Sequence, residues 1–76
     1  MFCSVDVVQT GHNIKILREQ MGMSVKQLSE HFSELTSEQP IYGWQQGKYL
    51  PSYENMLILS MIFQKPIEEI VAHKMR

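Results

Sequence analysis

The chain has 76 residues, about half the length of a typical domain, so it has room for a single core. Apolar residues make up 43% of it and one cysteine, Cys3, is present, which excludes a disulfide scaffold and fits a reducing cytoplasm. No apolar run approaches the ~20 residues that span a bilayer, so no membrane association is expected. The net charge of −1 argues weakly against a nucleic-acid partner.

The chain begins with a short segment before its first helix. Residues 1–9 are expected to form an N-terminal arm or leader, and the strand-like alternation near Phe2 to Val8 is too short to make a sheet alone. The first helix should follow, since apolar residues recur there at helical steps: Ile14, Leu17 and Met21. Thr10 is the predicted N-cap, and Gly22 is the predicted left-handed residue that ends this helix.

Two further short helices are predicted in the middle of the chain. Ser24 followed by Gln27 has the pattern of a capping box, ahead of an apolar stripe formed by Val25, Leu28 and Phe32. A third helix should begin near Ser37, because Pro40 is tolerated only in a first turn, and should end at Gly47. Its inward side is expected to carry Ile41 and Trp44.

The last part of the chain predicts two more helices. Ser52 should cap a fourth helix with the apolar stripe Tyr53, Met56, Leu57, Ser60 and Phe63. Pro66 should open a fifth helix, which carries Ile67, Ile70 and Val71. The predicted fold class is therefore all-α, a compact bundle of five short helices.

Several landmarks then occur in a recognisable order: Gly11-x-x-Ile14-x-x-Leu17-Arg18-Glu19, Gly22-Met23-Ser24, Leu28-Ser29-Glu30, Ile41-x-x-Trp44-Gln45-x-Gly47-Lys48 and Leu50-Pro51-Ser52. With them the sequence resembles the Cro and phage-repressor-like helix-turn-helix family, the xenobiotic-response-element type of bacterial regulators, over roughly residues 11–71. The resemblance implies a lambda-repressor-like DNA-binding domain over residues 10–76, usually dimeric, with the helix-turn-helix itself at about 24–46.

The resemblance also implies which residues meet double-stranded DNA. The third helix, residues 37–46, would lie in the major groove and turn five residues toward base edges: Glu38, Gln39, Tyr42, Gly43 and Gln46. Of these, Gln39 suits adenine and Glu38 could accept from cytosine. Phosphate contacts would come from Ser24, Lys26, Lys48, Tyr49, Ser52 and Arg18.

Four positions depart from the family pattern. The turn between the second and third helices is longer by about two residues, Gly43 replaces a long polar side chain, and Val25 stands where a polar phosphate contact is common. Gln45 stands where a glutamate usually pairs with the arginine of the first helix. A neutral amide still accepts one hydrogen bond from Arg18, but the loss of charge could free Arg18 to face a phosphate.

Apolar residues are in surplus on this short chain. Ile16, Ile58, Met61 and Ile62 fall outside the stripes that a minimal core needs. Residues 1–8 could fold back over the first and fourth helices to cover them. A partner subunit could also cover them, in a two-fold homodimer built on Ile58, Met61, Ile62, Ile67 and Ile70.

No chemistry of an enzyme is evident. The three histidines and Cys3 lack metal-ligand spacing, the glycines are isolated, and no catalytic residue, cofactor or small-molecule substrate is indicated. The resemblance implies a sequence-specific DNA-binding transcriptional regulator, most often a repressor, which we expect in the cytoplasm. The alternative is a protein-binding module, such as an antitoxin-like or DNA-incompetent helix-turn-helix domain, which the acidic Glu34 and Glu38, Gly43 and the apolar surplus favour.

Overall fold

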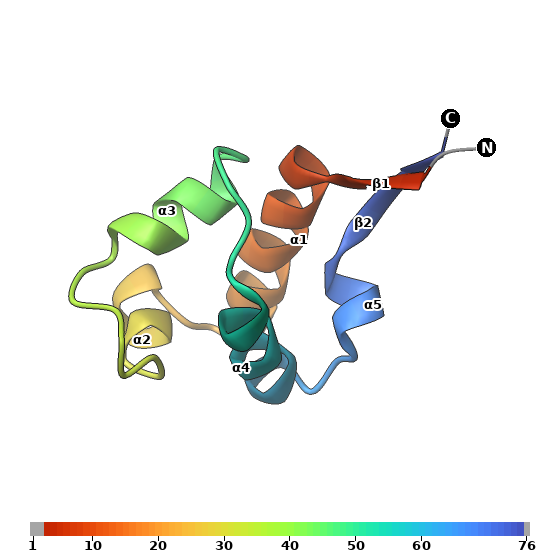
Figure 1. Cartoon of the computed structure of the whole chain (residues 1–76). Coiled ribbons are helices and arrows are strands. Elements are labelled where there is room, and N and C mark those ends of the chain that lie inside the picture. Colours follow the sequence, from red (N-terminus) through yellow and green to blue (C-terminus); the bar gives the residue numbers. More distant parts are fainter. Residues whose placement is uncertain (1–2, 76) are drawn as a thin grey trace.

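The computed structural model describes residues 3–75, which form five helices and two short strands. In chain order these are β1 (Cys3–Asp6), α1 (Val7–Gln20), α2 (Val25–Ser29), α3 (Gln39–Gln45), α4 (Tyr53–Phe63), α5 (Ile67–Ile70) and β2 (Ala72–Met75). Figure 1 shows α1 in the middle of the molecule, with α2 and α3 on one side of it and α5 and β2 on the other. None of the helices within residues 3–75 is long and apolar enough to cross a membrane.

The prediction of an all-α fold is wrong in one respect, because the two ends of the described chain pair as strands. β1 and β2 form an antiparallel sheet in which Cys3 lies opposite Met75 and Asp6 lies opposite Ala72 (Figure 1). The expected fold-back of residues 1–8 over the first and fourth helices is therefore replaced by strand pairing with β2 and by the first turn of α1. Met1 and Phe2 lie outside the described residues.

The first helix begins earlier than predicted. Its N-cap is Asp6, whose carboxylate accepts a hydrogen bond from the backbone N–H of Gln9 at 2.9 Å. Thr10 is not a cap: it lies inside α1 and is fully buried, and its Oγ1 accepts a hydrogen bond from the N–H of Ala72 at 2.9 Å. The threonine therefore joins α1 to the start of β2.

The other predicted helix ends are mostly confirmed. Ser24 and Gln27 form the reciprocal capping box of α2, and the Ser52 hydroxyl accepts from the backbone N–H of Asn55 at 3.2 Å. Gly22 has a φ of 70°, the left-handed conformation predicted for it. The start of α3 differs: it begins at Gln39 rather than near Ser37, with Pro40 in its first turn as expected.

The core combines residues from all five helices with Phe32, which lies just after α2. Its members are Ile14, Val25, Leu28, Phe32, Ile41, Trp44, Met56, Leu59, Phe63 and Ile70. The predicted stripe of α4 is partly wrong, since Tyr53 and Leu57 are 74% and 42% exposed and Leu59 is fully buried. This helix carries apolar residues on every side, so its periodicity does not single out the buried face.

Close packing of α3 on α1 completes the frame. A Cβ atom added to Gly11 of α1 would overlap the carbonyl oxygen of Trp44 in α3, so only glycine lets these two backbones approach as they do. The position of α3 is therefore set by α1 as well as by α2, and its far side is left free.

Candidate nucleic-acid interface

The helix-turn-helix consists of α2, the segment 30–38 and α3. Phe32, just after α2, packs edge-on against Trp44 of α3, with ring centroids 5.6 Å apart and an interplanar angle of 65°. Val25 is buried with them, so it belongs to the core and offers no phosphate contact. These contacts hold the two helices together although the turn between them is long.

The long turn forms one side of an open cleft of about 350 Å³. The cleft is lined by residues of α2 and of the turn: Lys26, Ser29, Glu30, Phe32, Leu35, Thr36, Ser37 and Glu38. The extra residues of the turn therefore lie beside α2 and leave the packing of Phe32 on Trp44 intact.

The face of α3 opposite the core is polar and accessible. Ile41 and Trp44 are buried on one side of this helix, and Gln39, Tyr42 and Gln46 are exposed on the other. Three of the five predicted base contacts therefore share one outward face. Of the other two, Glu38 is half-buried before the first turn, and Gly43 is buried.

Gly43 is covered by a side chain from the loop that follows α3. A Cβ atom added to Gly43 would overlap the Cζ and Oη atoms of Tyr49 and would lie 2.8 Å from its Cε1. Tyr49, predicted as a phosphate contact, therefore lies against α3. This contact was not predicted, although a glycine inside the predicted helix and an aromatic residue shortly after its end are both visible in the sequence.

The predicted phosphate contacts Ser24, Lys26, Lys48 and Ser52 are exposed at the ends of α2, α3 and α4. Ser24 and Ser52 use their hydroxyl oxygens to cap helices, as described above. Lys26 and Lys48 carry positive charge on the side of the molecule that holds α2 and α3. Glu30, Glu34 and Glu38 on the same side carry negative charge.

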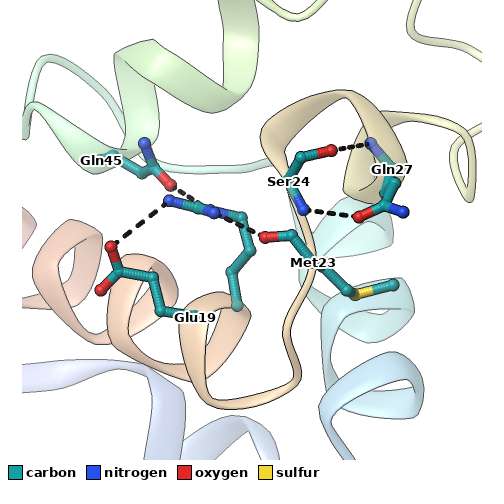
Figure 2. Close-up of polar contacts among 6 residues, drawn as sticks. Glu19, Met23, Ser24, Gln27 and Gln45 are labelled. Atoms are coloured by element: carbon teal, nitrogen blue, oxygen red, sulfur yellow. Dashed lines mark hydrogen bonds and ion pairs between the residues drawn. The ribbon is translucent and has the colours of Figure 1, made fainter.

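Arg18 departs from the predicted phosphate role. Its Nε donates to Oε1 of Gln45 at 2.9 Å and its Nη1 donates to the carbonyl oxygen of Met23 at 2.6 Å. Only 12% of its side chain is exposed, and Glu19 lies 3.9 Å from Nη2. Figure 2 shows the Gln45 amide and the Met23 carbonyl turned toward this guanidinium from two sides. The hydrogen bond to a neutral amide was expected, but the idea that Arg18 is free to face a phosphate is wrong.

The predicted dimer residues fall into three groups. Ile70 is fully buried in the protein's own core, because α5 packs against α1 and α4, so it cannot meet a partner. Ile58, Ile62 and Ile67 are partly buried against that core. Met61 is 79% exposed. Ile16, which the minimal core did not need, is 37% exposed.

No metal site accompanies these features: among the described residues, no three His, Cys, Asp or Glu side chains lie close enough to hold an ion. His31 is exposed.

The architecture is similar to that of a solved DNA-binding domain. The DNA-binding domain of BldD matches with a TM-score of 0.72 and 16% sequence identity, over 88% of this chain and 94% of that domain. No family model and no curated protein matches the sequence. The chain therefore has the fold of a helix-turn-helix DNA-binding domain, with a two-stranded sheet added to its five helices.

Proposed function

We propose that the chain is a sequence-specific DNA-binding transcriptional regulator of the Cro and phage-repressor-like family that inserts α3 into the major groove of double-stranded DNA. The observation that carries the proposal is the outward face of α3, where Gln39, Tyr42 and Gln46 are exposed opposite the buried Ile41 and Trp44. A glutamine can donate to and accept from adenine at once, the pairing that discriminates this base in the major groove. The likeness of the fold to the DNA-binding domain of BldD supports DNA as the partner.

The electrostatic part of binding should be small. Lys26 and Lys48 are the exposed cations that flank α2 and α3, since Arg18 is held inside the fold. Two neutralised phosphates per subunit predict a log–log salt slope of about −2 per subunit and about −4 for a dimer. The affinity for random duplex should therefore be modest.

A homodimer would raise the affinity for DNA above the modest value expected for one subunit. A second copy bound through the exposed side of α4, around Met61, would place two recognition helices on half-sites about one helical turn apart. Such a dimer would repress transcription by occupying an operator and excluding polymerase. The function needs no cofactor and no catalysis, and it belongs in the cytoplasm, where bacterial DNA lies.

The first prediction concerns the salt dependence of DNA binding. Duplexes enriched from a random pool should bind more tightly than the pool itself, and log K should fall linearly with log salt at the slope given above. Fluorescence anisotropy from 50 to 200 mM salt measures both quantities. Replacing Lys26 or Lys48 by Met should weaken binding to all sequences and make the slope shallower by about 1.

Lys74→Met is the matched control, because β2 lies on the far side of α1 from α2 and α3 (Figure 1). It should leave the salt slope unchanged. Negligible binding to every duplex at 50 mM salt would contradict the proposal and favour the protein-binding module. The acidic Glu30, Glu34 and Glu38 beside α3 are the observation that favours that second candidate.

A further inference from the structure

The proposed recognition helix, α3, has a position without a side chain on its outward face, at Gly43. With 100° per residue, position 43 lies on the side of α3 opposite Ile41 and next to the exposed Gln39 and Gln46. A residue placed there should be accessible, yet Gly43 is buried. What covers it is the ring of Tyr49, which is itself 48% exposed.

The turn at the end of α3 explains how Tyr49 reaches this place. Gly47 has a φ of 73° and its N–H donates to the carbonyl of Trp44 at 3.1 Å, while the N–H of Lys48 donates to the carbonyl of Gly43 at 3.0 Å. This is a Schellman motif, in which the chain reverses and runs back over the last turn of the helix. The side chain two residues past Gly47 is thereby brought onto Gly43.

The fit is specific for glycine at position 43. The phenol end of Tyr49, its Cζ and Oη, occupies the space that a Cβ atom of residue 43 would take. Any other residue there would displace the ring, although glycine is unfavourable in a helix interior. The helix therefore presents at this position a hydroxyl and a ring edge that come from the loop.

We infer that Tyr49 is a base-reading residue that replaces the missing side chain of position 43, an inference that rests on the proposed insertion of α3 into the major groove. Its hydroxyl can donate to or accept from a base edge, and its ring edge can contact a thymine methyl group. The reading face then consists of Gln39, Tyr42, Gln46 and Tyr49. Because none of these side chains is charged, selectivity for sequence is separated from the salt-dependent contacts of Lys26 and Lys48.

The test uses the full chain and duplexes selected by the wild-type protein. Tyr49→Phe should lower affinity for the preferred duplex about fivefold, as expected for one lost hydrogen bond, and should flatten the preference at one base pair per half-site. Affinity for random duplex and the salt slope should stay as in the wild type. Tyr53→Phe, at an exposed tyrosine on α4, is the control and should change neither quantity.

A second variant tests the link between the two residues. Gly43→Ala favours the helix but pushes the Tyr49 ring away, so it should cause the same selective loss of affinity for the preferred duplex. The double variant Gly43→Ala with Tyr49→Phe should lose no more affinity than either single variant. Circular dichroism confirms that each variant is folded.

Four results would overturn the inference. An equal loss for all sequences in Tyr49→Phe would make Tyr49 a phosphate contact, and additive losses in the double variant would separate it from Gly43. Unchanged binding by Tyr49→Phe, with selective binding by the wild type, would remove Tyr49 from the interface and leave the proposed function standing. If the wild type binds no duplex selectively, the proposed function fails and the inference fails with it.

Discussion

Arg18 of α1 connects the segment ahead of α2 to α3 through a single guanidinium. It comes from α1, donates to the carbonyl of Met23 just ahead of α2, and donates to the side chain of Gln45 in α3. Charged hydrogen bonds of this kind are stronger than neutral ones, and both acceptors are partly buried. The residue therefore positions α3 relative to α1, and only 12% of its side chain is exposed.

The expected effect of Arg18→Met is a loss of stability without a loss of intrinsic DNA affinity. Removing the guanidinium leaves two acceptors unsatisfied, which should cost about 2 kcal/mol of unfolding free energy. Urea denaturation measures this cost, and Lys15→Met, at an exposed site on the same helix, should lie near the wild type. A variant as stable as the wild type but weaker on DNA would return Arg18 to the phosphate contacts.

Tyr49 shows where prediction of the site from sequence stops. The exposure of Gln39, Tyr42 and Gln46 follows from helical periodicity once Ile41 and Trp44 face inward. The place of Tyr49 depends on a left-handed turn at Gly47 and on the absence of a side chain at Gly43, which only three-dimensional geometry joins. The hydrogen bond from Arg18 to Gln45 could be predicted from the sequence, but the burial of the Arg18 side chain could not.

At the scale of the elements, most helix ends followed from local signals, although the cap of α1 is Asp6 and not the predicted Thr10, and the sheet was not predicted. The caps at Ser24 and Ser52 and the stop at Gly22 involve neighbours within four residues, and all three are confirmed. The sheet depends on β1 meeting a strand at the other end of the described chain. No local pattern reports such a pairing, and no strand was predicted at residues 72–75.

The attachment of β2 to α1 yields a prediction about Thr10. Thr10→Val keeps the shape of the side chain but removes the acceptor of the Ala72 N–H, so we expect the unfolding free energy to fall by about 1–2 kcal/mol. Thermal or urea unfolding measures the change. Thr10→Ser keeps the hydroxyl and should retain the hydrogen bond. If the valine variant proves at least as stable as the wild type, the hydrogen bond does not anchor the sheet.

For the molecule as a whole, the position of its charges matters more than their sum. A net charge of −1 suggests poor attraction to DNA. Lys26 and Lys48 lie on the side of the molecule that holds α2 and α3, and Lys74 lies on β2 on the far side of α1 (Figure 1). Because most of the Arg18 side chain is buried, few side chains would supply positive charge to the proposed DNA interface. Under the proposed function, self-association would therefore be the most direct way to strengthen binding to DNA.

Self-association is tested by Met61→Glu. Met61 is 79% exposed on α4, so a carboxylate there should leave the fold intact but place two like charges at a two-fold interface. Sedimentation should show dimerisation weakened by at least about tenfold, and binding to a two-half-site operator should weaken with it. Gln20→Glu, at an exposed position at the end of α1, controls for the added charge. A wild type that stays monomeric at high micromolar concentration would contradict the dimer.

The strand pair at the ends of the described chain also has a consequence for the order of assembly. Joining β1 to β2 closes a loop of nearly the whole chain, at an entropic cost on the order of 4 kcal/mol if it formed alone. The contacts of α1 with α3 span much shorter loops, so they form at lower cost and bring the strands together afterwards. We therefore expect the sheet to form last during folding and to open first during unfolding, while α3 stays packed against α1.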